Sequence, residues 1–90
     1  MSLTDLEITR KRLLWRATHR GIKEMDILVG GYAQLHLATM GQTELTHFAD
    51  LLEIPDQDLL SWATKQSSVP LEQQSAMLEA MLRFLPEGNL

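Results

Sequence analysis

Glycine and proline divide this chain into short segments, and within each segment apolar residues recur every three or four positions. The clearest stripe consists of Met25, Leu28, Val29, Tyr32 and Leu35. This spacing places side chains on one face of an α-helix, and no stretch alternates polar and apolar residues as a strand requires. We therefore expect an all-α fold, a compact bundle of five short helices. The 90 residues suit a single helical domain, with residues 86–90 as a short C-terminal tail.

Capping signals indicate where the helices begin and end. Thr4 and Glu7 form a capping box, so the first helix is expected to run from there to about residue 19. Gly21 is then expected to adopt the left-handed conformation that commonly ends a helix. The second helix is expected over about residues 22–38 and the last from near Pro70 to about Leu85. Between them, Gly41 is expected to cap a helix that carries residues 45–52, and Asp56 a short helix that carries residues 59–63. Gly30 and Gly31 interrupt the second helix at about 1 kcal/mol each relative to alanine, which indicates a close helix contact or a kink.

The amino-acid composition excludes several kinds of functional site. The chain has no cysteine, so a disulfide framework, a thiolate metal site and a thiol nucleophile are excluded. His19, His36 and His47 show no metal-ligand spacing, and no catalytic set or glycine-rich phosphate loop is present. We therefore expect a protein that is not an enzyme, holds no metal and binds no cofactor stably. Because the sequence has no apolar run of membrane-spanning length and no signal peptide, we expect it in the cytoplasm.

Charge is divided unevenly along the chain. The net charge is −4, but residues 1–24 carry +3 and the remaining residues carry −7. A basic end of this kind suits an acidic partner. Because the acidic remainder would repel a phosphate backbone, we expect the partner to be a protein and not a nucleic acid. The chain itself is expected to be a monomer.

The candidate partner-binding residues gather in the basic end: Arg12, Trp15, Arg16, Arg20, Gly21, Glu24 and Asp26. Arginine recurs every four residues at Arg12, Arg16 and Arg20. On one helix face these three side chains would repel one another unless an anion neutralises them. Trp15 lies among them, and tryptophan and arginine are enriched at interface hot spots, so the cluster favours a docking surface. Arg20 and Glu24, taken alone, are typical of an exposed ion pair worth at most about 1 kcal/mol. Alanine at either position is therefore expected to leave folding normal.

The order of these residues resembles a known family. The chain contains Arg12-x-x-Trp15 and then Arg20-Gly21-x-x-Glu24-x-Asp26, a series that resembles the N-terminal signature of the SdhE/YgfY family of flavinylation factors. The family hallmark is Arg-Gly-x-x-Glu. The resemblance continues through Glu44-Leu45-x-x-Phe48-x-x-Leu51-Leu52 and Asp56-x-Asp58-Leu59-x-x-Trp62 to Pro70.

That resemblance implies an assembly factor that binds the flavoprotein subunit of succinate dehydrogenase, or of fumarate reductase. Such a factor promotes covalent attachment of FAD to a histidine of its partner, and FAD would be the partner's cofactor. The implied mechanism is positional, because the factor would hold the partner so that histidine and flavin methyl approach each other. Arg20 and Glu24 would pair with partner side chains, and Gly21 would let backbone come close to the flavin site. One alternative stays open, a small helical adaptor or antitoxin-type protein-binding module.

Overall fold

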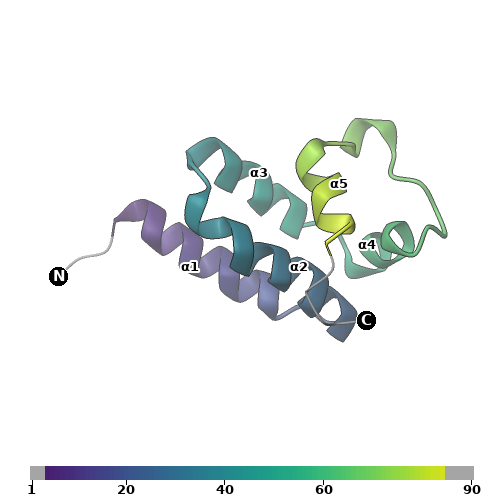
Figure 1. The fold of residues 1–90 in the computed structure, drawn as a ribbon, viewed down its shortest axis with the longest axis horizontal. Helices are drawn as coiled ribbons and strands as arrows, with labels where there is room; N and C mark the ends of the chain where they lie inside the picture. Colours follow the sequence, from purple (N-terminus) through teal and green to yellow (C-terminus); the bar gives the residue numbers. More distant parts are fainter. Residues whose placement is uncertain (1–3, 85–90) are drawn as a thin grey trace.

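Five α-helices and two 3-10 helices follow one another along residues 4–84, the part of the chain that the computed structural model describes (Figure 1). The α-helices are α1 (Asp5–Thr18), α2 (Lys23–His36), α3 (Gln42–Leu52), α4 (Asp56–Ala63) and α5 (Ala76–Leu82). The 3-10 helices are η1 (Leu37–Thr39), which continues from α2, and η2 (Leu71–Gln73), which precedes α5. These residues contain no strand, so the all-α prediction is confirmed. The predicted tail over 86–90 lies outside the described residues.

Helices α1 and α2 form an antiparallel pair on which the other helices pack (Figure 1). Helix α1 begins at the predicted capping box: Thr4 Oγ1 accepts from the Glu7 amide at 3.1 Å, and Glu7 Oε1 accepts from the Thr4 amide at 2.9 Å. It turns Leu13 and Ala17 into the core. Helix α3 lies against α1, whereas α4 and α5 lie against α2. The opposite face of α1 is left in solvent.

Two separate contacts account for Gly30 and Gly31. A Cβ atom on Gly30 would lie 3.0 Å from Thr18 Cγ2 and 3.2 Å from the Ala17 carbonyl oxygen. A hydrogen at this position therefore lets α1 and α2 approach closely. A Cβ atom on Gly31 would lie 2.6 Å from the ring of Phe84, which covers this glycine. Of the two explanations for the glycines, the close contact is confirmed.

Every α-helix contributes to the core. The largest fully buried side chains of the core are Met25, Val29, Leu45, Phe48, Leu59, Leu78 and Met81. Tyr32 joins the aromatic part of the core, with its ring centroid 6.2 Å from those of Phe48 and Phe84. The predicted stripe on α2 is buried except at Leu35, which is 64 % exposed because that side of the last turn of α2 is uncovered.

Two expected helix boundaries are wrong. Helix α2 stops at His36, and the chain tightens into η1. The last helix starts at Ala76 and not near Pro70, since Ser75 Oγ caps it by accepting from the Leu78 amide at 3.1 Å. Pro70 instead precedes η2, a short turn in which no side chain is buried. Without an apolar face to pack, that turn does not extend into α5.

Candidate partner-binding site

The connection from α1 to α2 and the first turn of α2 form the corner, residues 19–26, which holds most of the predicted site. The expected left-handed conformation of Gly21 is wrong, because its φ lies outside that region. Side chains bond to two carbonyls of the last two turns of α1 instead. Thr18 Oγ1 donates to the carbonyl four residues earlier at 2.8 Å, and His19 Nδ1 lies 2.7 Å from the Trp15 carbonyl oxygen. The helix therefore ends without the conformational freedom of glycine.

The Arg20 side chain turns inward and crosses to the junction of α3 and α4. Its Nε donates to Asp56 Oδ1 at 2.7 Å, its Nη1 to the Leu52 carbonyl at 2.8 Å and its Nη2 to the Ile54 carbonyl at 2.7 Å. The side chains of Arg20 and Asp56 are only 10 % and 17 % exposed, so water screens this ion pair weakly. Arg20 thereby also caps the C-terminus of α3. The exposed ion pair with Glu24 suggested by the sequence is wrong.

Two carboxylates hold the backbone of the corner. Asp56 Oδ2 accepts from the Gly21 amide at 3.0 Å while Oδ1 binds Arg20. Asp26, on α2, accepts a hydrogen bond from the Arg20 amide. Asp56 was not expected among the site residues, because an acid at a helix start is already explained by the helix dipole. The only available signal was its place in the segment that resembles the family.

Gly21 and Glu24 are left on the outside of the corner, and both are exposed. Among residues 4–84, a Cβ atom on Gly21 would meet a single neighbour within 4 Å, Asp56 Oδ2 at 3.5 Å, so these residues leave the space in front of it open. Glu24 lies in the first turn of α2, where the helix dipole favours a carboxylate. The corner therefore presents bare backbone beside a negative charge, on a frame that Arg20 and Asp56 fix.

The exposed face of α1 adjoins the corner. Trp15 is 62 % exposed, and its ring stacks on that of His19 with centroids 4.2 Å apart and planes 11° apart. Arg12 is exposed and makes no ion pair with any described residue. An indole ring beside a free guanidinium is the kind of surface that protein partners bind.

The expected row of three aligned guanidinium groups is wrong. Helix α1 ends at Thr18, so Arg20 lies beyond it and points inward. Arg16 pairs with Glu53, the residue that follows α3. The repulsion inferred for the row is therefore relieved within the chain, and Arg12 is the member that stays free to meet a partner.

The site offers charged side chains, an aromatic surface and exposed backbone, and each of these can contact a partner. Within residues 4–84 no three histidine, aspartate or glutamate side chains gather as metal ligands. No helix of that range combines the length and apolar character needed to cross a bilayer.

Comparison with known proteins places this arrangement in a family. A family model named Sdh5, described as flavinator of succinate dehydrogenase, matches residues 11–85. The chain is 40 % identical over 78 residues to FAD assembly factor SdhE of Acetobacter pasteurianus, covering 87 % of this chain and 72 % of that protein.

The chain is also similar to proteins named as mitochondrial. The chain is 40 % identical over 88 residues to succinate dehydrogenase assembly factor 2 of Yarrowia lipolytica, covering 94 % of this chain and 61 % of that protein. Against the protein of the same name from Dictyostelium discoideum, identity is 32 % over 77 residues, covering 86 % of this chain and 55 % of that protein. The chain thus spans little more than half of these longer relatives. The resemblance seen in the sequence is confirmed: the chain belongs to the Sdh5 family, the flavinators of succinate dehydrogenase.

Proposed function

We propose that this chain is an assembly factor that binds the flavoprotein subunit of succinate dehydrogenase and promotes covalent attachment of FAD to it. One observation carries the proposal: a corner with bare backbone at Gly21 and a carboxylate at Glu24, fixed from behind by the Arg20–Asp56 pair. Family membership supports the choice of partner. Fumarate reductase, whose flavoprotein subunit is the second candidate partner, belongs to the same proposal.

The proposed mechanism is positional and not catalytic. The reacting groups, a histidine and the flavin methyl, both belong to the partner, and FAD is the partner's cofactor. Holding two reacting groups in productive geometry can supply a large part of a rate enhancement without any chemistry by the holder. Because Gly21 carries no side chain, its backbone can approach the partner closely. Glu24 would orient a donor of the partner beside it.

Docking would begin at the exposed face of α1. Arg12 and Trp15 offer a cation and an aromatic ring, and the net positive charge of residues 1–24 suits an acidic patch on the partner. Association should therefore slow as salt rises, since salt screens exposed charges. A monomer and a cytoplasmic location are further parts of the proposal. The relatives comprise a bacterial protein and proteins named as mitochondrial.

The test compares cells with and without the gene for this chain. Covalent flavin on the flavoprotein subunit is measured by its fluorescence in a denaturing gel, and the amount of subunit is measured by immunoblot. We expect covalent flavin per subunit to fall in the deletion strain and to return with the wild-type gene. Unchanged covalent flavin in the deletion strain would contradict the proposal.

A further inference from the structure

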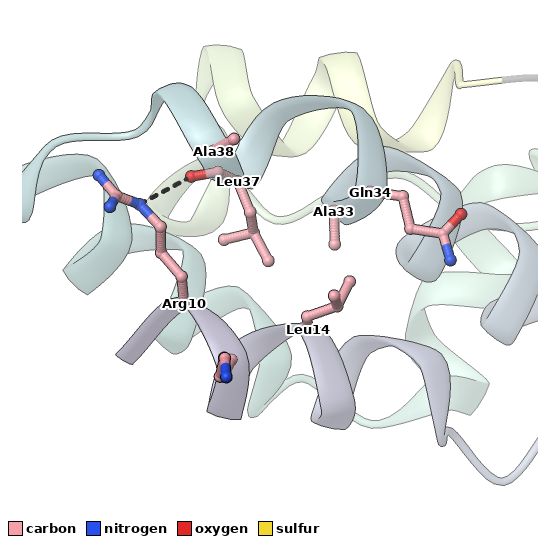
Figure 2. Close-up of a pocket in the computed structure, with 7 residues that line it drawn as sticks. Arg10, Leu14, Ala33, Gln34, Leu37 and Ala38 are labelled. Carbon is pink, nitrogen blue, oxygen red and sulfur yellow. Dashed lines mark hydrogen bonds between the residues drawn. The ribbon is translucent and has the colours of Figure 1, made fainter. Parts of the chain in front are cut away.

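A shallow hollow lies between α1 and the segment formed by α2 and η1, at some distance from the corner (Figure 2). It is lined by Arg10, Lys11, Leu14, Ala33, Gln34, Leu37 and Ala38. Figure 2 shows Leu14 reaching into this space from α1, with Ala33 and Leu37 facing it from the other side. The hollow therefore has an apolar floor and polar or charged side chains at its rim.

The hollow is part of the folded frame. Ala33 is fully buried and Leu37 is 5 % exposed, so both are fixed by the core beneath them. Arg10 ties the two sides together, because its Nε donates to the Leu37 carbonyl at 3.1 Å and its Nη2 to the Met40 carbonyl at 2.8 Å. A preformed site of this kind costs little ordering when a ligand binds.

The volume and charge of the hollow limit which groups it can bind. The volume of about 200 Å³ is below the roughly 300–1,000 Å³ typical of small-molecule pockets, so one side chain fits better than a cofactor. The rim holds the cations Arg10 and Lys11, and none of the described residues that line the hollow is a carboxylate. Hydrogen bonds from Thr4 lower the pKa of Glu7, which is outside the lining, and Glu7 lies close enough to both cations for their charges to help lower that pKa. Lys11 is exposed and makes no ion pair with any described residue. The matching occupant is an apolar side chain that has carboxylates beside it.

We infer that this hollow receives a large apolar side chain from an acidic segment of the flavoprotein subunit. The inference rests on the proposed function and names a second point of attachment for it. Lys11 and Trp15 are four residues apart and so are neighbours on the surface of α1, which makes the hollow continuous with the proposed docking face. Lys11 lies about 10 Å along the α1 axis from Thr18, the last residue before the corner. Contacts at both places would fix the orientation of the partner, which one contact alone does not.

The first test fills the hollow. Ala38 lies at its rim and is exposed, so Ala38→Trp should cover the floor without disturbing the core. Ala76→Trp is the matched control, since Ala76 is also exposed but lies on α5 outside the hollow. Binding of each purified variant to the purified flavoprotein subunit is measured by fluorescence anisotropy, and folding by circular dichroism. We expect Ala38→Trp to weaken binding roughly tenfold or more and Ala76→Trp to leave it unchanged.

The second test reverses charge at the rim. Lys11→Glu should weaken binding at low salt, and the loss should shrink as salt rises. Lys65→Glu makes the same change of net charge at an exposed residue beyond α4 and should have little effect. Equal losses in the two variants would mean that the partner senses net charge only, and the acidic occupant would be wrong.

The third test identifies the occupant. Since the chain has no cysteine, Gln34→Cys carries a single benzophenone label at the rim. We expect the cross-linked peptide of the flavoprotein subunit to contain a large apolar residue flanked by aspartate or glutamate.

Four further outcomes would overturn the inference. A cross-linked peptide without carboxylates contradicts the stated chemistry, as does binding of free FAD that Ala38→Trp abolishes. Wild-type affinity of Ala38→Trp for the flavoprotein subunit shows that the hollow is unused, and leaves the proposed function standing. Failure of the wild-type chain to bind that subunit removes the proposed function and the inference together.

Discussion

Removing the Asp56 carboxylate should weaken the fold far more than removing an ordinary surface acid. Asp56→Ala deletes two hydrogen bonds to the corner, one from the Arg20 guanidinium at 2.7 Å and one from the Gly21 amide at 3.0 Å. Hydrogen bonds to charged groups contribute about 1.5–3 kcal/mol each, and breaking a shielded ion pair leaves a charge poorly solvated. Arg20 keeps two carbonyl acceptors, which moderates the loss.

We therefore expect Asp56→Ala to lower the free energy of unfolding by about 3 kcal/mol. A domain of this length has roughly 5–13 kcal/mol in total, so the loss is a large fraction of its stability. At about 4–8 °C per kcal/mol for a domain of this size, Tm should fall by roughly 12–24 °C. Arg20→Ala should be destabilising as well, contrary to what an exposed ion pair would predict.

Asp58 provides the matched control. It lies in the same first turn of α4 but is exposed, and its side chain makes no hydrogen bond with any described residue. Asp58→Ala should cost only the helix-dipole contribution of about 0.3–1 kcal/mol. Urea and thermal unfolding followed by circular dichroism compare the two variants. If Asp56→Ala unfolds at the same urea concentration as Asp58→Ala, the argument for a structural ion pair is refuted.

Three further outcomes follow from features of the fold. Gly30→Ala should lower Tm despite the better helix propensity of alanine, because the new methyl group would lie 3.2 Å from the Ala17 carbonyl oxygen; thermal denaturation checks this. Gly21→Ala and Gly21→Arg should both melt within a few degrees of wild type, since the space at Gly21 is open, but only arginine should abolish flavinylation in the gel assay. Activity that tracks Tm in both variants would make the corner a structural joint only. Hydrogen bonds from Thr4 lower the pKa of Glu7 below its ordinary value of 4.5, so this carboxylate stabilises α1 above that pH, and the contribution is lost as pH falls through the lowered pKa. The protection of the first-turn amides of α1 against exchange, measured relative to their intrinsic rate at each pH, should fall over that range in wild type and stay constant in Glu7→Gln.

Local sequence signals predicted the helices well where a single mechanism set the boundary. The capping box of Thr4 and Glu7 starts α1 as expected, because both bonds join residues three positions apart. The end of α1 was harder to predict, because the helix ends with side-chain bonds from Thr18 and His19 to carbonyls of its last two turns and without a left-handed glycine. Among the described residues, the non-glycine residue with a left-handed backbone conformation is Lys65, which follows α4. The composition of that segment gave no sign of this conformation.

The non-local part of the site was not predictable from one sequence. Arg20 and Asp56 are 36 residues apart, and no spacing rule connects residues across two intervening helices. In the sequence, Arg20 precedes Gly21, and Glu24 follows four residues after Arg20, a spacing that suggests a local ion pair. Glu24 was therefore the predicted partner of Arg20. The two carbonyls that bind Arg20, that of Leu52 in α3 and that of Ile54 after it, belong to the backbone, which leaves no trace in side-chain composition. Gly21, whose backbone the resemblance implied would come close to a flavin site, is exposed.

The long reach of Arg20 has a consequence for synthesis. The corner leaves the ribosome before Leu52, Ile54 and Asp56, which hold it, have been translated. A nascent chain that stops short of Asp56 therefore cannot assemble the corner, however well its first two helices form. The folded form of the corner therefore becomes available only once the chain through Asp56 has been synthesised.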